Sequence, residues 1–146
     1  MFSKILVPVD IDYPKTAAAV YQRAAEIAKH SAAEIRLISV MPGFGMPIVA
    51  SFISDEMRKE IVNRLKQSLE AFIKNSCDEP VSYEVRTGKN WEEIIKTADK
   101  WEADLIVVYY DHRRDRDIHE VHSSTCARKV VENANCSVLW LRKVLS

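Results

Sequence analysis

The sequence predicts an α/β protein: one three-layer, doubly wound domain built on a five-stranded parallel sheet. Short apolar, β-branched runs of strand length recur along the chain, and each of the first four is followed by a longer segment with helical apolar spacing. The resulting order, β-α-β-α-β-α-β-α-β, requires right-handed crossovers with helices on both faces of the sheet. At 146 residues, the chain accommodates a single domain over residues 1–146, with no internal linker.

The strands are predicted from five apolar runs, over residues 4–9, 34–40, 81–86, 103–110 and 137–142. Continuous runs such as KILVPV and LIVVYY are typical of strands buried on both faces, whereas the alternating VSYEVR favours an edge strand.

Four helices are predicted, over residues 14–30, from 54, after 90, and over 124–134. Pro14 suits the first turn of the first helix, and Ser54 precedes two acids favourable in the first turn of the second. Spacing predicts an inward apolar stripe on the second helix (Met57, Ile61, Leu65, Leu69, Phe72, Ile73) and on the last (Ala127, Val130, Val131). The Gly- and Pro-containing stretch 41–52, between the second strand and the second helix, is predicted to be a loop that packs on its own domain, or that covers a cleft or meets a partner.

Composition limits the classes of partner. Lysine and arginine together equal aspartate and glutamate, at 21 each, so no global charge favours nucleic acid or an anionic membrane. No apolar run has the roughly 20 residues that a membrane span requires, and the N-terminus lacks a signal-peptide pattern. Three widely spaced cysteines without a CxxC favour reduced thiols, and so a cytoplasmic protein.

Residues 104–125 (DLIVVYYDHRRDRDIHEVHSST) form the first candidate site. An apolar run changes abruptly to alternating charge and ends on Ser123, Ser124 and Thr125, which can cap a helix. Ligands of open α/β sheets usually bind at the carboxyl ends of central strands. We therefore expect any ligand to contact this segment.

Three segments together resemble the universal stress protein family: the opening KILVPVD, the late strand ADLIVV, and the ending KVVENANCSVLWLR. The resemblance covers essentially the whole chain. It implies a Rossmann-like sheet of order 3-2-1-4-5, similar to the adenine nucleotide alpha hydrolases, and a dimer formed through the last strand. It also allows exchange of partners between related family members.

In the nucleotide-binding branch of that family, the first strand ends near an Asp that approaches the adenosine. By resemblance, this Asp corresponds to Asp10, beside Pro8 and Val9, and Val40 would line the adenine pocket. The family's phosphate motif is Gly-x-x-Gly, nine residues, then Gly-Ser/Thr. Glycines let backbone N–H groups crowd the phosphates at a helix N-terminus.

This sequence contains no glycine after Gly88. Tyr109, Tyr110, Asp111 and His112 stand where Gly-x-x-Gly belongs, and only the hydroxyl cap at residues 123–125 is retained. The resemblance therefore implies that the usual ATP grip is absent or altered.

Other chemistries remain open for the same segment. Arg113, with its two neighbouring arginines, could bind phosphate in place of the glycines, or could pair with nearby acids on the surface. His112, His119 and His122 could ligate a metal or titrate near neutral pH, although their spacing matches no established zinc signature.

The sequence thus predicts a non-catalytic, cytoplasmic stress-response module that forms a homodimer through Val138, Trp140 and Arg142 of its last strand. The alternative is an ATP- or AMP-binding switch, or a weak ATPase, that uses Asp10, Val40, the hydroxyls of residues 123–125 and loop arginines. No GxSxG, HExxH or Walker A motif indicates another enzyme class.

Overall fold

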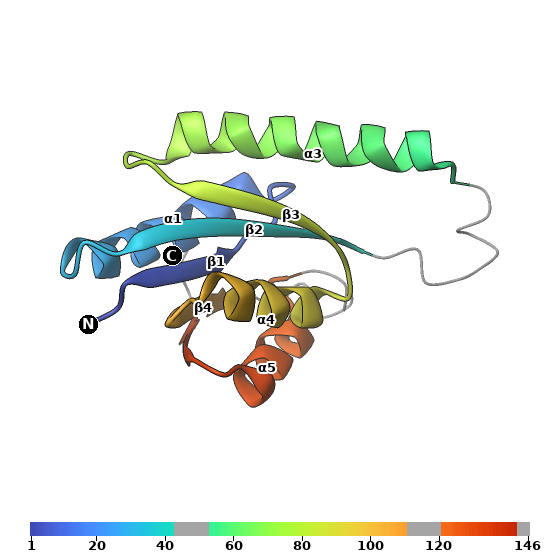
Figure 1. Cartoon of the computed structure of the whole chain (residues 1–146). Helices are drawn as coiled ribbons and strands as arrows, with labels where there is room; N and C mark the ends of the chain where they lie inside the picture. The colour runs from blue at the N-terminus through green and yellow to red at the C-terminus, as the bar shows by residue number, and fades with distance from the viewer. Residues whose placement is uncertain (43–52, 111–120, 143–146) are drawn as a thin grey trace.

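The computed structural model describes residues 1–42, 53–110 and 121–142 (Figure 1). Within these ranges the strands are β1 (Lys4–Pro8), β2 (Glu34–Pro42), β3 (Ser82–Gly88), β4 (Leu105–Tyr109) and β5 (Ser137–Leu141). The helices are α1 (Pro14–Lys29), α3 (Asp55–Ser76), α4 (Asn90–Trp101) and α5 (Ser124–Asn133). All strand pairs are parallel and the order is β3-β2-β1-β4-β5, which confirms the predicted fold class and topology.

Alternation along the strands separates two cores, one on each face of the sheet. On β1, Ile5 and Val7 face the layer of α1 and α3, whereas Leu6 faces the layer of α4 and α5. Figure 1 shows these two helical layers on opposite sides of the strands. The central strands are buried on both faces, as their continuous apolar runs predict.

Both outer strands of the described sheet are only half-buried, and the alternating run that indicated an edge strand is β3. β2 and β3 each extend two residues beyond the predicted range, to Pro42 and Gly88, which are paired partners. Gly88, the last residue of β3, has a φ of 148°, a conformation that favours glycine, and the chain leaves the sheet for α4 there.

Three predicted inward positions are wrong. Met57 and Ile61, in the first half of α3, are 49% and 39% exposed, and Val131 on α5 is also exposed. The sheet provides a cover for Leu69 and Phe72 in the second half of α3, but the helix is longer than the strand beside it. Periodicity identifies an apolar face without showing how much of it has a partner.

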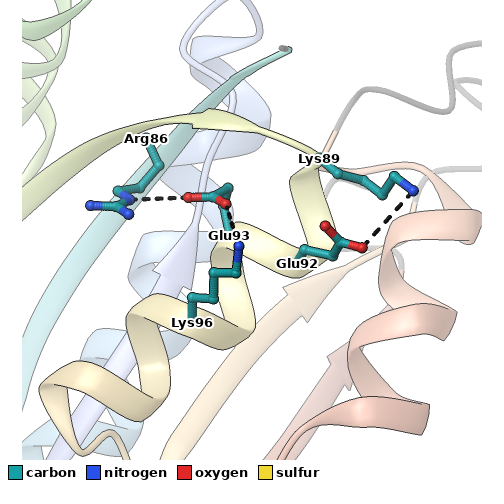
Figure 2. A network of polar contacts seen from close by, with 5 residues as sticks. All are labelled: Arg86, Lys89, Glu92, Glu93 and Lys96. Carbon is teal, nitrogen blue, oxygen red and sulfur yellow. Dashed lines mark hydrogen bonds and ion pairs between the residues drawn. The ribbon is translucent and has the colours of Figure 1, made fainter. Parts of the chain in front are cut away.

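The β3–α4 turn is held by ion pairs (Figure 2). The carboxylate of Glu93 accepts from Arg86 Nε at 3.2 Å and lies 3.4 Å from Lys96 Nζ, and Lys89 pairs with Glu92 at 3.9 Å. Because the Glu93 side chain is only 10% exposed, its charge is compensated by two cations rather than by water.

Candidate functional site

The carboxyl ends of β1 and β4 lie side by side at the point where the strand order reverses direction. Such a switch point is where open α/β sheets place ligands. We call this region the mouth and define it by Asp10, Val40, Tyr109 and Ser123, which lie at or next to the ends of β1, β2, β4 and the start of α5. The segment 111–120, which follows β4, lies outside the described residues.

Asp10 organises the turn that leaves β1. Its Oδ1 accepts from the backbone N–H of Asp12 at 3.0 Å, and its carbonyl accepts from the N–H of Tyr13 at 3.1 Å. This Asx-type turn leads the chain into α1, whose first residue is Pro14. The carboxylate is only half-buried, so it combines a turn-forming role with access to the mouth.

Ser39 fixes the neighbouring backbone. Its hydroxyl donates to the carbonyl of Val9 at 3.0 Å, while the N–H of Val9 donates to the carbonyl of Ile38 at 2.9 Å. Ser39 is buried, so the bond replaces solvent with a fixed partner. Sequence reasoning missed this residue, although a lone hydroxyl within the apolar run of β2 was a usable signal.

Two aromatic rings cover the start of α5. Tyr109 is 4% exposed and His122 is fully buried, and their rings meet edge to face with centroids 5.6 Å apart. His122 immediately precedes Ser123, the N-cap residue of α5. These rings therefore occupy space directly beside the helix N-terminus. The sequence places His122 in a polar segment that could ligate a metal, whereas the structure buries its side chain completely.

The N-terminus of α5 is capped by its own chain. Ser123 Oγ accepts from the N–H of Cys126 at 3.2 Å, and the serine side chain is fully buried. Of the two other predicted hydroxyls, Ser124 is half-buried and Thr125 is exposed. Burial raises the pKa of the Cys126 thiol to about 12, so this cysteine is a core residue and not a nucleophile.

The structure brings most of the predicted site residues to the carboxyl edge. Val9, Asp10, Val40 and Tyr109 lie there together with residues 123–125, and Pro8 is buried within β1. Arg113 falls outside the described residues, as do His112 and His119. Among the residues that the structure describes, no three His, Cys, Asp or Glu side chains gather in a metal-binding arrangement.

Beyond the mouth, β5 carries an aromatic and cationic cluster. The Arg142 guanidinium lies 5.5 Å from the ring centroid of Tyr110 and 5.4 Å from that of Trp140, and the two rings meet edge to face. These contacts tie the residue after β4 to the outer strand of the sheet.

No helix of the described chain has the length and apolarity to cross a bilayer.

Fold and mouth together define a doubly wound α/β protein with a candidate site at its switch point. A family model for the universal stress protein family matches residues 1–142. The chain belongs to the universal stress protein family.

Solved structures share the fold at low sequence identity. The hypothetical protein MJ0577 is 22% identical, with a TM-score of 0.75 and coverage of 100% of this chain and 99% of that chain. A universal stress protein in complex with cAMP is 18% identical, with a TM-score of 0.62 and 97% of both chains covered. The universal stress protein from Archaeoglobus fulgidus in complex with dAMP is 22% identical, with a TM-score of 0.57 and 94% and 96% covered.

Proposed function

We propose that this protein is a non-catalytic, homodimeric regulatory module of the cytoplasmic stress response, in which the family's phosphate grip at the mouth is lost. The observation that carries the proposal is the pair of rings beside α5. Tyr109 and His122 take up space at the helix N-terminus where the resemblance puts glycines and phosphate. Without those glycines, the backbone cannot approach a phosphate closely from β4.

The capping of α5 supports the same proposal. A free helix N-terminus offers several N–H groups to an anion, but here the N–H of Cys126 already has Ser123 Oγ as its acceptor. The cap is buried, so a phosphate would have to displace an internal hydrogen bond and also move two rings. Both requirements disfavour a triphosphate in this position.

The alternative is an adenine-nucleotide switch, and a specific observation favours it. Two proteins of the same fold were crystallised with cAMP and dAMP, ligands that carry one phosphate rather than three. Asp10 and Val40 remain at the mouth to receive an adenosine, with Ser124 and Thr125 nearby and Arg113 as the candidate phosphate ligand. A nucleotide bound through its base and ribose would satisfy this arrangement.

Calorimetric titration with adenosine, AMP and Mg-ATP separates the two functions, together with mass spectrometry of protein purified without added nucleotide. A module without a nucleotide gives no heat and no co-purifying ligand. An adenosine-based switch binds AMP, and Asp10→Ala weakens that binding. Mg-ATP bound far more tightly than AMP would contradict the loss of the grip.

The dimer is proposed to form through β5, which pairs only with β4 in the described sheet. Its outer edge therefore offers backbone groups to a second copy, and half-buried Val138 and Trp140 supply apolar area. Val138→Lys should yield monomers by sedimentation velocity. Val85→Lys makes the same change on the opposite edge strand and should leave the dimer intact; an unchanged profile for Val138→Lys refutes this interface.

A further inference from the structure

A cavity lies between α3 and the carboxyl ends of β2 and β3. Its volume is about 530 Å³, within the range of small-molecule sites. Its described lining is Met41, Arg58, Lys59, Val62, Asn63, Lys66, Thr87 and Gly88, with no carboxylate among them. We call this cavity the α3 cleft. In Figure 1, α3 runs alongside β3 above the sheet.

Helical spacing places the polar lining on one face of α3. Lys59, Asn63 and Lys66 follow one another at intervals of four and three residues, so they share one face of the helix. Lys59 and Lys66 are seven residues apart, which corresponds to about 10 Å along the helix axis. The ammonium groups of Lys59 and Lys66 therefore lie along one side of the cleft, with the Asn63 amide between them. Half-buried Arg58 also lines the cleft.

Sheet register places the cleft on the opposite face from the Glu93 network. Met41 pairs with Thr87 and so shares a face with it, whereas Val40 pairs with Arg86 and packs into the core of α4 and α5. Arg86 holds Glu93 on that second face (Figure 2). The carboxylate nearest to Gly88 is therefore already paired, with Arg86 and Lys96, and lies on the α4 side.

Among the described residues, the two lysines of the cleft have no ion-pair partner. On α3, Glu60 pairs with Arg64, and within the described residues neither Lys59 nor Lys66 makes an ion pair. The twelve residues between β2 and α3 in the sequence, 43–54, include no charged residue. The two ammonium groups on one side of the cavity repel each other in the empty state, and an anion between them relieves that repulsion.

We propose that the α3 cleft binds a small phosphorylated molecule, with its phosphate between Lys59 and Lys66. Lysine ammonium and arginine guanidinium groups suit phosphate oxygens, and the Asn63 amide and Thr87 hydroxyl can donate further hydrogen bonds. Met41 and Val62 supply an apolar wall for the organic part of the ligand. The site is separate from the mouth and does not depend on the function proposed there.

Amide NMR titration with inorganic pyrophosphate tests the proposal on the full chain, with NaCl at matched ionic strength as the reference. We expect saturable shifts at Asn63, Thr87 and Gly88 and none at Cys126, whose N–H belongs to the mouth. Lys59→Gln/Lys66→Gln should weaken binding at least about tenfold. Lys74→Gln/Lys100→Gln removes two exposed lysines outside the cleft, one from α3 and one from α4, and should bind as the native protein does.

Three results would each overturn the proposal: no saturable shift up to 10 mM pyrophosphate, shifts confined to the mouth, or equal affinity in both double variants. All four lysines are exposed, so the substitutions should not prevent folding, and an unchanged amide spectrum of the free protein verifies this. Tight ATP binding at the mouth would contradict the function proposed there, but it would not contradict anion binding in the α3 cleft.

Discussion

The two helix caps provide a matched pair that tests the burial of the mouth. Ser123 Oγ accepts from the N–H of Cys126 at 3.2 Å, and Ser54 Oγ accepts from the N–H of Met57 at 3.1 Å. The hydrogen bonds are nearly identical, but Ser123 is fully buried and Ser54 is exposed. Replacing either serine by alanine removes one acceptor from one helix N-terminus.

The two substitutions should nevertheless lower the free energy of unfolding by different amounts. Losing a helix cap costs about 0.5–2 kcal/mol, and an exposed N–H regains a partner from water. Ser54→Ala should therefore lower the free energy of unfolding by only about 0.5 kcal/mol. The N–H of Cys126 is buried, and a buried donor without a partner costs about 1–3 kcal/mol. We expect Ser123→Ala to lower the free energy of unfolding by about 2 kcal/mol.

Urea unfolding followed by circular dichroism measures both losses in the free energy of unfolding, and thermal unfolding measures the corresponding shifts in Tm. At this chain length, 1 kcal/mol corresponds to roughly 2–4 °C in Tm, so Ser123→Ala should melt about 4–8 °C below the native protein and Ser54→Ala about 1–2 °C below it. Equal losses in the two variants, or no loss in Ser123→Ala, would refute the buried cap, which is one of the observations that support the lost phosphate grip.

Three further predictions concern the scaffold. Gly88→Ala should destabilise the protein by about 1–3 kcal/mol in urea melts, since φ is 148° and an added Cβ would lie 3.1 Å from Glu93 Cγ; an unchanged midpoint would contradict this. The Asp104 carboxylate accepts hydrogen bonds from the backbone N–H groups of Ser3 and Lys4, at 2.8 and 3.0 Å. Burial acts to raise the pKa of Asp104, but these hydrogen bonds outweigh that effect and hold the pKa below its usual value. The resulting stability is present above about pH 4 and is lost as pH falls through the lowered pKa, so Asp104→Asn should flatten the acid limb of stability against pH, and parallel curves would argue against it. The Cys126 thiol, with a pKa of about 12, should resist iodoacetamide at pH 8 under native conditions, and rapid modification would show that the mouth opens.

The fold was predictable because a buried parallel sheet leaves an unambiguous pattern. Continuous runs such as those of β1 and β4 specify strands covered on both faces, and the intervening helical spacing specifies the crossovers. Strand ends were less certain, because Gly88 continues the pairing with β2 through a backbone conformation that periodicity cannot reveal. Exposure along α3 could not be predicted either, because it depends on how far the helix outruns the sheet beneath it.

The candidate site was predictable as a place but not in its details. Asp10 and Val40 were located from strand ends and family resemblance, and the structure puts them at the carboxyl edge. The burial of His122 was not foreseen, since a histidine within a charged segment gives no sign that it faces the core. The α3 cleft could not be predicted, because lysines along one face of a helix are most simply solvated surface residues, and only the structure places the ends of β2 and β3 beside them.

Whether the mouth still grips phosphate is tested most directly by comparing adenosine with Mg-ATP in one calorimetric series. The series should be run in the Lys59→Gln/Lys66→Gln variant, so that the α3 cleft does not contribute to the heat. With the grip lost, Mg-ATP binds no more than about threefold more tightly than adenosine, or neither ligand binds; this corresponds to less than about 1 kcal/mol from three phosphates. A hundredfold preference for Mg-ATP would contradict the account.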